Sequence, residues 1–570
     1  MKAKSNGLSR RDFLKGAATG AAGIASIGIM GGCAPKVATP APAGSEAAAA
    51  TSADWLGEEP VIDTIAETVE SDVIVIGGGT GGAYAAASCL EKGLKVIVLE
   101  KNTTNSTVRN DWGAIGSKWQ VEGGAKGLDK ATILHYHAMY CANRIDQRLP
   151  RIWADESADA INWIGDLIVS KGGSFDWEGG YEPDFEHTAS YPKFPTGHSA
   201  FWGSPDMSTA IMMKEYIEEM GGEFRFETTF VKFEHEGKQV TGAIAKDKDG
   251  KYIRFVGKKG LVLSTGGYQG NPTMLNALQP ADVMVMAKPT EGPNSGDGIK
   301  ACLWMGAAMD ECHTSMLFDR MGLLPNETPA NMTVPTLFWL GSQPWLKVNL
   351  KGERFCNESQ PYDFILHAAA RQPGATYCAI MDSTWFDQVQ QFQTVGCSRI
   401  FPYPNGSPND TPFFVPPGTD TNAIGENGKA IWASLVESGH LQQADSPEEL
   451  ATKLNIPSDT FAATLKRYNE LADAGEDEDF YKDAYRFISV KTPPYYGIRL
   501  TGMILCTMDG IRVDTDSKPL DSMNEPFEGL YVIGDSSGSY FAHTYPNLFT
   551  GYANGRTIVF ARRLARHLAA

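Results

Sequence analysis

The stretch Asp72-Val-Ile-Val-Ile-Gly-Gly-Gly-Thr-Gly-Gly82 decides the fold of this chain. It begins with a short apolar run typical of a buried strand, and an Ala-rich segment to about Lys92 follows as a predicted helix. A second apolar strand, Val96–Leu99, ends at Glu100. Glycines spaced G-x-G-x-x-G between a strand and a helix, with an acid about 20 residues further on, are typical of dinucleotide-binding proteins. The stretch therefore predicts an α/β fold with a Rossmann-like domain.

Each part of this motif has a role in binding a dinucleotide. Gly77 makes the tight turn, Gly79 lets the backbone approach a pyrophosphate, and Gly82 lets the helix pack against the strand. The N–H groups at the start of the helix favour phosphate. Glu100 would accept hydrogen bonds from ribose hydroxyls. These four residues are the first candidates for cofactor binding.

Two later segments favour FAD over NAD as the dinucleotide. Gly260-Leu-Val-Leu-Ser-Thr-Gly-Gly267 reads as another strand that ends in a glycine turn. Near the C-terminus, Gly529-Leu-Tyr-Val-Ile-Gly-Asp535 reads as a strand that ends in an acid, and a helix is predicted from about Thr550 to Ala569. A C-terminal segment that returns to the first domain is expected where a flavin lies extended along it.

Together with Asn294-Ser-Gly-Asp-Gly298 and Gly352-Glu-Arg-Phe-Cys-Asn-Glu358, these segments resemble the flavoprotein family of fumarate reductases and 3-ketosteroid dehydrogenases. The resemblance covers about residues 70–570. It implies FAD as the cofactor, bound by a discontinuous domain of residues 70–308 and 496–570. An α+β substrate-capping domain, residues 309–495, would be inserted between these parts. Further flavin contacts are implied at Gly113, Ala114, Val231, Asp297, Asp535, Ala553 and Asn554.

The groups with which fumarate reductases of this family hold a dicarboxylate have no counterparts at the matching positions. Tyr362 stands where the proton-donating Arg would fall, and Leu548 and Cys506 replace an Arg and a His that bind carboxylates. Phe338 and Gly341 stand near the Glu and Arg of the usual proton relay. A buried carboxylate without charged partners is costly. The pattern is therefore closer to the ketosteroid dehydrogenase branch.

Two tyrosines are the candidate catalytic residues. Asn357-Glu-Ser-Gln-Pro-Tyr362 and Ala542-His-Thr-Tyr-Pro546 both resemble ketosteroid dehydrogenase segments. By this resemblance Tyr362 exchanges a proton at the carbon α to a carbonyl, and Tyr545 hydrogen-bonds the carbonyl oxygen. Tyrosine, with an ordinary pKa of about 10, is protonated at neutral pH, which suits the reductive direction.

Other active-site positions are less well defined. Phe549 stands where the family has a glycine, and only Tyr136 and Tyr140 are available, without a motif, for the family's tyrosine in the N-terminal half. Three aromatic residues of the capping region either line a pocket for a flat apolar substrate or pack in its core: Phe338, Trp339 and Trp345.

The resemblance implies a flavin-dependent reductase of carbon–carbon double bonds conjugated to a carbonyl, with hydride from the flavin N5 and a proton from Tyr362. Its small-molecule substrate would be an enone, an unsaturated lactone, or a steroid-like or phenylpropenoid compound. Three alternatives stay open. One is an unsaturated-acid reductase that uses other arginines, such as Arg320 or Arg399. The others are an oxidative ketosteroid dehydrogenase and a flavin electron-transfer protein without its own substrate.

Composition limits the partners. The 570 residues include 50 Lys and Arg against 68 Asp and Glu, a net charge of −18, so binding to nucleic acid is not expected. The nine cysteines form no C-x-x-C or C-x-x-C-H motif, so neither a metal site nor a c-type haem is expected.

The N-terminus resembles an export signal. Arg10 and Arg11 precede a Gly/Ala-rich run, as in twin-arginine signals, and Met30-Gly-Gly-Cys33 resembles a lipoprotein box. Residues 1–33 would be the signal, with a lipid anchor on Cys33, and residues 34–69 a flexible linker. Outside the cytoplasm the enzyme would take electrons from a cytochrome c or a flavinylated membrane-linked protein, in anaerobic respiration.

Overall fold

The glycine motif lies at the end of the central strand of a parallel sheet. In the computed structural model, the residues described are 55–105, 110–179, 192, 194–204, 207–286, 291–332, 336–337, 340–392 and 432–570. The predicted signal, Cys33 and most of the predicted linker lie outside these ranges. Contacts group Ser52–Ala570 into one unit, and this unit contains all the helices and strands of the described residues.

The first sheet has seven strands in the order β6-β2-β1-β9-β8-β7, and β16 also pairs with β9. β1, β2, β6, β9 and β16 pair in parallel, whereas β7 and β8 form an antiparallel extension. The strands are β1 (Glu67–Ile76), β2 (Val96–Leu99), β6 (Glu223–Arg225), β7 (Thr229–Glu236), β8 (Gln239–Lys246), β9 (Tyr252–Leu263) and β16 (Leu530–Val532). Val73–Ile76 and Val96–Leu99 are buried, as expected for parallel strands covered by helices.

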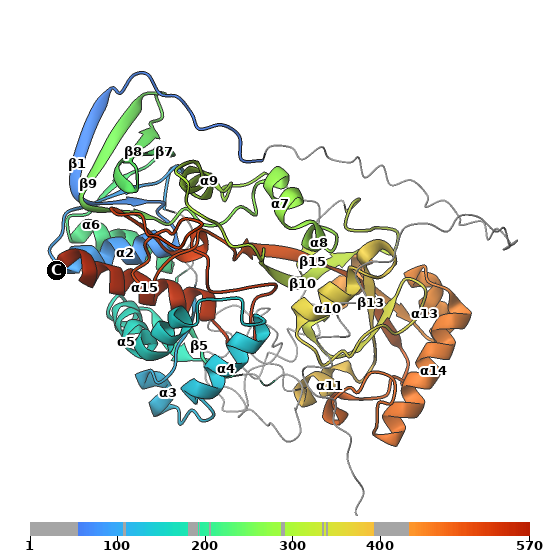
Figure 1. Cartoon of the computed structure of the whole chain (residues 1–570). Helices are drawn as coiled ribbons and strands as arrows, with labels where there is room; N and C mark the ends of the chain where they lie inside the picture. Colours follow the sequence, from blue (N-terminus) through green and yellow to red (C-terminus); the bar gives the residue numbers. More distant parts are fainter. Residues whose placement is uncertain are drawn as a thin grey trace, which may run out of the picture. The chain divides into compact units, whose positions relative to one another are not determined.

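Helices from distant parts of the sequence pack together beside the parallel sheet. α2 (Thr80–Glu91) contacts α6 (Thr209–Glu219) and the C-terminal helix α15 (Tyr552–Ala569), which in turn packs on α5 (Arg148–Ser170) (Figure 1). α15 begins two residues later than the sequence predicts, because Gly551 adopts a left-handed conformation with φ +72° and caps it. Strand β16 and helix α15 thus complete a domain that begins with β1.

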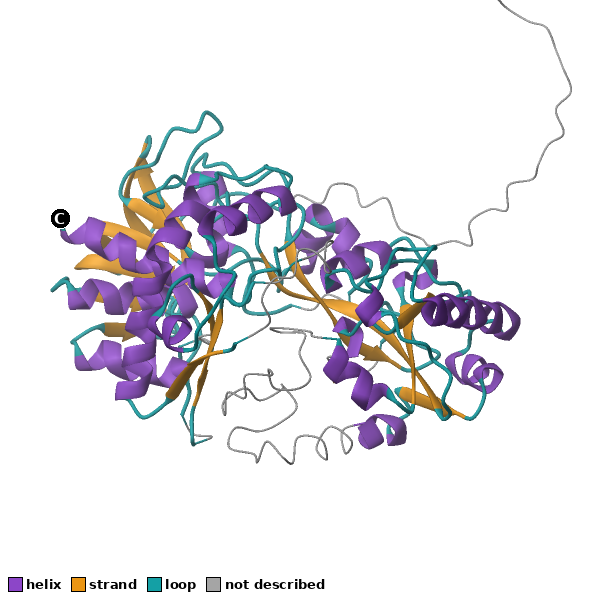
Figure 2. Ribbon diagram, turned by 90° about the horizontal axis from the view of Figure 1, so that it is seen from below, coloured by secondary structure: helices purple, strands orange, loops and turns teal. Residues whose placement is uncertain are grey.

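The second sheet lies between β9 and β16 in the sequence. Its order is β11-β10-β15-β13-β12, with β14 paired to β15, and all its pairs are antiparallel. Figure 2 shows the strands of the described residues in orange, with purple helices packed around them. The strands are β10 (Ser315–Leu323), β11 (Thr336–Leu337), β12 (Leu346–Asn349), β13 (Tyr377–Asp382), β14 (Leu441–Ala444) and β15 (Tyr495–Thr507). Its helices are α10 (Tyr362–Ala369), α11 (Trp385–Gln391), α13 (Pro447–Leu454) and α14 (Ser458–Ala474). This mixed architecture with a parallel sheet confirms the predicted fold class.

Smaller elements join these two parts. A three-stranded antiparallel sheet consists of β3 (Asp111–Gly113), β5 (Gly197–Phe201) and β4 (Ser174–Trp177). The remaining helices are α3 (Lys118–Glu122), α4 (Lys130–Tyr140), α7 (Pro272–Leu278), α8 (Pro280–Val283) and α9 (Asp297–Trp304). Short 3₁₀ turns lie at η1 (Leu340–Ser342), η2 (Pro373–Ala375), η5 (Ala484–Arg486) and η6 (Gly534–Ser536).

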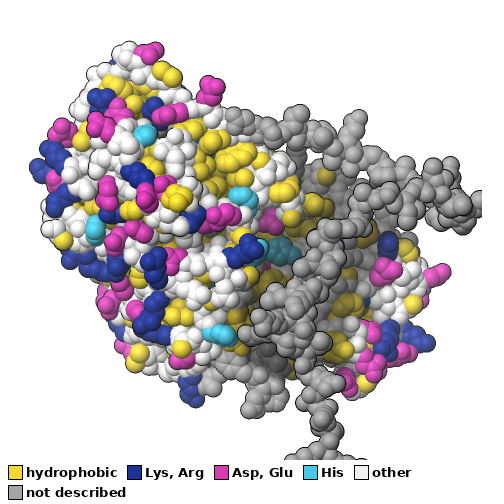
Figure 3. Space-filling view, in the orientation of Figure 1, with side chains coloured by type: hydrophobic (Ala, Val, Ile, Leu, Met, Phe, Trp, Pro, Cys, Tyr) yellow, Lys and Arg dark blue, Asp and Glu magenta, His cyan; other side chains and the backbone are white. Residues whose placement is uncertain are grey.

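The surface of the described part is mixed in charge. On the face shown in Figure 3, Lys and Arg side chains are interspersed with Asp and Glu. Within the described ranges, no helix is both long enough and apolar enough to cross a membrane.

Candidate active site

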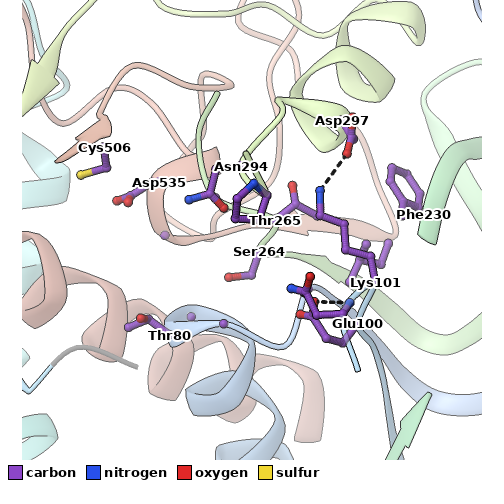
Figure 4. A pocket seen from close by; sticks show the side chains of 18 of the residues that line it. Thr80, Glu100, Lys101, Phe230, Ser264, Thr265, Asn294, Asp297, Cys506 and Asp535 are labelled. Atoms are coloured by element: carbon purple, nitrogen blue, oxygen red, sulfur yellow. Dashed lines mark hydrogen bonds and ion pairs between the residues drawn. The ribbon is translucent and has the colours of Figure 1, made fainter. Parts of the chain in front are cut away.

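A cavity of about 310 Å³ opens at the carboxyl ends of the parallel strands, where ligands bind in sheets of this kind. In Figure 4, Glu100 and Lys101 lie toward one side of it and Cys506 and Asp535 toward the other. Seven of the residues predicted to bind the cofactor line this cavity: Gly77, Gly79, Glu100, Asp297, Asp535, Ala553 and Asn554. Ser264, Thr265 and Asn294, from the glycine-containing segments 260–267 and 294–298, complete its centre.

The glycine turn leaves no room for side chains. Gly77 has φ +98°, and a Cβ there would lie 2.5 Å from the carbonyl oxygen of Ser264. A Cβ on Gly82 would overlap the carbonyl oxygen of Gly77. Gly82 therefore lies where α2 packs closely against β1, as the sequence predicts. It is not part of the cavity lining. The turn is a close-approach surface of the kind that a pyrophosphate requires.

Glu100 is held rigidly at the edge of the cavity. Its Oε2 accepts a hydrogen bond from the Gly78 N–H at 2.9 Å. Its Oε1 accepts from the backbone N–H of Asn102 at 2.9 Å and from the Asn102 amide at 2.7 Å. The side chain is buried at the end of β2. A carboxylate fixed in this way suits the recognition of vicinal ribose hydroxyls.

Two further acids of the cavity have cationic partners. Asp297 begins α9, and its Oδ2 lies 3.3 Å from Lys101 Nζ and accepts a hydrogen bond from the Ser295 hydroxyl at 2.6 Å (Figure 4). Asp535, in η6, lies 3.6 Å from the guanidinium of Arg556, which is buried in α15. The wall of the cavity therefore presents polar groups over much of its length.

Three residues that the resemblance assigns to flavin contact lie near the cavity but do not line it. Gly113 donates its N–H to the Gly551 oxygen at 2.7 Å, and a Cβ there would lie 2.7 Å from the oxygen of Thr550. It therefore lets β3 approach the start of α15. Ala114 follows it and donates its N–H to Thr196. Val231 is the extra residue of a bulge in β7, beside the lining residue Phe230.

Tyr545 lies at the edge of the cavity. Its hydroxyl oxygen accepts a hydrogen bond from the backbone N–H of Ala553 at 3.1 Å, and Ala553 lines the cavity. The side chain is buried, in ring contact with Phe541. Because the tyrosine oxygen is the acceptor, this bond does not consume the hydroxyl proton.

Tyr362 is the first residue of α10 and is not part of the cavity lining. Its ring meets Phe318 of β10 edge-on, with ring centroids 5.2 Å apart and planes at 87°. Two residues earlier in β10, Met316 pairs with Cys506 of β15, which does line the cavity. Tyr362 thus packs on β10, whose partner strand β15 carries the cavity residue Cys506.

A buried carboxylate that no sequence motif revealed links the neighbours of the two tyrosines. Asp363 accepts hydrogen bonds from the Tyr140 hydroxyl at 2.7 Å, from the Asn547 amide at 2.6 Å and from the Thr544 hydroxyl. Burial raises the pKa of Asp363. Burial and the adjacent Asp363 raise the pKa of Tyr140 far above its usual range. Of the two unassigned tyrosines, Tyr140 is thus the one in contact with this network, which we call the Asp363 network.

Trp345, an aromatic candidate of the capping region, is buried. It packs against Phe392 and Trp432, with ring centroids 6.2 Å away in each case. Phe338, Trp339 and Arg399, together with the side chain of Arg320, lie outside the described part. Within that part, the cavity lining contains no arginine and no histidine.

The cavity fits a flavin dinucleotide. The side-chain-free turn suits a pyrophosphate, Glu100 suits a ribose, and the first turn of α15 borders the opposite region through Ala553 and Asn554. Tyr545 lies next to this last region. The residues present can therefore hold FAD.

Comparisons with known proteins agree with this fit. The chain is 25% identical over 516 residues to the vinyl phenol reductase of Lactiplantibacillus plantarum, a match that covers 89% of this chain and 98% of that protein. It is 24% identical to a probable fumarate reductase of Shewanella frigidimarina, over 86% of this chain and 74% of that one. The solved 3-ketosteroid-Δ4-(5α)-dehydrogenase of Rhodococcus jostii shares the fold, with a TM-score of 0.64, 18% identity and coverage of 89% and 98%.

A family model described as "FAD binding domain" matches residues 72–547, which contain the glycine motif, both catalytic candidates and the second sheet. The cavity at the glycine turn accounts for such a cofactor, and the two relatives compared by sequence are reductases. The chain belongs to this FAD-binding family and is an FAD-dependent oxidoreductase that acts on carbon–carbon bonds.

Proposed function

We propose that this protein reduces a carbon–carbon double bond conjugated to the carbonyl of a small, uncharged substrate. The observation that carries the proposal is the position of Tyr545, whose hydroxyl is bonded to the cavity residue Ala553 and whose neighbour Thr544 is bonded to the residue after Tyr362. The residues next to the two tyrosines in the sequence, Thr544 and Asp363, are thus hydrogen-bonded to each other, which supports a shared role for Tyr545 and Tyr362. Tyr362, Leu548 and Cys506 stand where fumarate reductases of this family have charged groups for a carboxylate, and this supports an uncharged substrate.

The proposed chemistry assigns one task to each tyrosine. FAD, when bound, supplies a hydride to the β-carbon of the double bond. Negative charge then develops on the conjugated carbonyl oxygen, and the hydroxyl of Tyr545 stabilises it by donating a hydrogen bond. Tyr362 donates its proton to the α-carbon. A tyrosine with its ordinary pKa of about 10 holds that proton at neutral pH, as the reductive direction needs.

The substrate class follows from the surroundings of the tyrosines. Phe318 contacts the ring of Tyr362 and Phe541 contacts the ring of Tyr545, so aromatic surface borders each of the two phenol groups. The name of the Lactiplantibacillus plantarum relative, a vinyl phenol reductase, indicates that this family includes enzymes for aromatic substrates. We therefore favour enones, unsaturated lactones, and steroid-like or phenylpropenoid compounds.

We also propose that the enzyme works outside the cytoplasm. Arg10, Arg11 and Cys33 support export by the twin-arginine pathway, with a lipid anchor. Electrons would then come from a cytochrome c or a flavinylated membrane-linked protein, in anaerobic respiration. Cell fractionation, with mass determination of the mature N-terminus, tests this proposal, and a cytoplasmic protein with an intact N-terminus would contradict it.

The test of the proposed reaction is anaerobic reoxidation of the chemically reduced holoprotein, followed at the flavin absorbance band. The panel holds fumarate, a cinnamate-type acid, a 4-en-3-one steroid and an unsaturated lactone. We expect reoxidation by an uncharged enone or lactone and a loss of about 100-fold or more in Tyr362→Phe, with FAD content unchanged. Tyr481→Phe, a substitution at an exposed tyrosine, is the matched control and should reoxidise at the parent rate. Reoxidation by fumarate alone would overturn the proposal.

A further inference from the structure

Asp363 is a carboxylate in the interior of the protein, and its surroundings indicate what it does there. It is buried in the first turn of α10, and the charged side chain that interacts with it is His367, four residues on in the same helix, whose ring also lies 3.7 Å from Asp282. A buried carboxylate costs stability even with such a partner, and an apolar residue of similar size would often cost less. The side chain must therefore serve a purpose other than stability.

The bonds of Asp363 indicate that purpose. Thr544 immediately precedes Tyr545 and Asn547 follows it by two residues, and both side chains donate to Asp363. On its own helix, Asp363 immediately follows Tyr362. The carboxylate thus joins the segment that carries one tyrosine to the helix that begins with the other. Through Tyr140 it also joins both to α4.

The segment around Tyr545 needs such support. His543 has φ +68°, in the left-handed region that side chains other than glycine seldom adopt. Two tight turns follow each other, with Thr544 N–H bonded to Ala542 O and Asn547 N–H bonded to Tyr545 O, each at 2.8 Å. A strained backbone persists only where its surroundings hold it. The Asp363 network supplies that hold.

Resting on the proposed function, we propose that Asp363 is a positioning residue that fixes Tyr545 and Tyr362 relative to each other for the reduction step. A carboxylate accepts hydrogen bonds on both oxygens, and one oxygen here faces the Asn547 amide nitrogen, which can only donate. An asparagine at this position would keep an oxygen toward Asn547 and present its NH₂ group to two hydroxyls. The hydroxyl groups of Tyr140 and Thr544 would then have to rotate, so that they accept hydrogen bonds from this NH₂ group instead of donating them.

The experiment compares Asp363→Leu, Asp363→Asn and Thr544→Val with the parent holoenzyme, in each of the parent and Tyr362→Phe backgrounds. The probe is the uncharged substrate that reoxidises the parent fastest. For each variant, FAD content, the midpoint of thermal unfolding, kcat and KM are measured. Asp382→Asn is the matched control, because Asp382 is equally buried and accepts from Thr384, Lys491 and Thr492 in the second sheet, away from α10.

We expect Asp363→Leu to lower kcat by about 10–100-fold, with KM changed by less than about threefold, because a misplaced group reacts slowly although the substrate still binds. Asp363→Asn and Thr544→Val should also lower kcat with little change in KM, but by a smaller factor than Asp363→Leu. In the Tyr362→Phe background, Asp363→Leu should cost a smaller factor than in the parent, since one of the two groups that it positions is already absent. Asp382→Asn should lower the unfolding midpoint and leave kcat unchanged.

Two results would overturn the positioning role. One is a parent-like kcat in Asp363→Asn and Thr544→Val, and these variants decide the matter if Asp363→Leu loses FAD or fails to fold. The other is a loss in Asp363→Leu that multiplies fully with that of Tyr362→Phe, which would show independent action. Failure of the proposed function is distinguishable, because in that case Tyr362→Phe alone would reoxidise at the parent rate.

Discussion

The cofactor cavity and the Asp363 network are built in opposite ways. The cavity is shaped by backbone at positions such as Gly77 and Gly82, where a side chain would collide with a neighbouring carbonyl. The network is shaped by side chains, which join Tyr140, Asp363 and Thr544 from segments far apart in the sequence. The shape of the cavity depends on the absence of side chains at these glycines, whereas the Asp363 network depends on hydrogen bonds between side chains.

This difference determines how each region responds to change. A methyl group added where no space exists displaces whole elements, because the packed interior cannot absorb it. A hydrogen bond removed from a network of three leaves the remaining bonds in place. A single added side chain in the cavity should therefore abolish FAD binding. A single substitution in the Asp363 network should lower the reaction rate only in part.

The largest effect is expected from Gly82→Val, which tests whether the glycine turn beside the cavity tolerates a side chain. Any Cβ at this position overlaps the carbonyl oxygen of Gly77, so α2 must move away from β1. We expect the variant to purify without FAD, measured as the ratio of flavin to protein absorbance. Gly203→Ala is the control, because a Cβ there has no heavy atom within 4 Å. A Gly82→Val protein with parental FAD content would contradict the account of exclusion.

An intermediate effect is expected from Glu100→Gln, which changes polarity in the cavity without changing its shape. Both carboxylate oxygens accept backbone N–H groups, from Gly78 and Asn102, so an amide nitrogen must face one of these donors. Losing one bond to a charged group costs about 1.5–3 kcal/mol, or about 10–100-fold in FAD affinity. Titration of the apoprotein with FAD measures this, with the exposed Glu67→Gln as control. Unchanged affinity would show that Glu100 does not contribute to FAD binding.

The smallest effect is expected from His137→Leu, which probes the region of the tyrosines through acid stability. His137, in α4, is buried among the rings of Phe541, Phe549 and Tyr552. Burial, assisted by the charge of Arg556, lowers the pKa of His137 to about 3. The unfolded chain binds the proton near pH 6.5, so folding stability falls as pH drops below that value toward 3.

Between pH 7 and pH 5, this histidine alone should remove about 2 kcal/mol from the free energy of unfolding. Denaturant unfolding of the parent and of His137→Leu at both pH values isolates this contribution, because the carboxylates common to both proteins cancel in the difference. The variant should lose less stability than the parent on acidification. Equal losses would mean that His137 takes up its proton in the folded state as readily as in the unfolded chain.

The same contrast explains how far the sequence could be interpreted. The parallel sheet and seven of the cavity-lining residues can be predicted from short segments, because glycine spacing and strand ends act locally, whereas FAD as cofactor follows from the family resemblance. The start of α15 was misplaced by two residues, since its boundary depends on the left-handed conformation of Gly551. The flavin contact at Gly113 stays a prediction, and in the structure the close contact of Gly113 is with residues 550–552 at the start of α15.

The Asp363 network could not be predicted in this way. Asp363 is separated by 223 residues from Tyr140 and by 181 from Thr544, and none of the three belongs to a spacing motif. A charged residue after Tyr362 reads as an ordinary member of the first turn of a helix, where acids are favoured anyway. The available hints were Tyr140, considered without a motif, and the two segments that contain Tyr362 and Tyr545. Only the tertiary fold shows that their neighbours meet.

The late return of the chain to its first sheet has a consequence for biogenesis. β16 pairs with β9, and α15 supplies Ala553 and Asn554 to the cavity, so a nascent chain lacks these parts until synthesis is nearly complete. Part of the nucleotide site is therefore missing until the C-terminal residues have been synthesised. Flavin loading must be a post-translational event, and a polypeptide truncated before Leu530 should leave the ribosome unable to retain the cofactor.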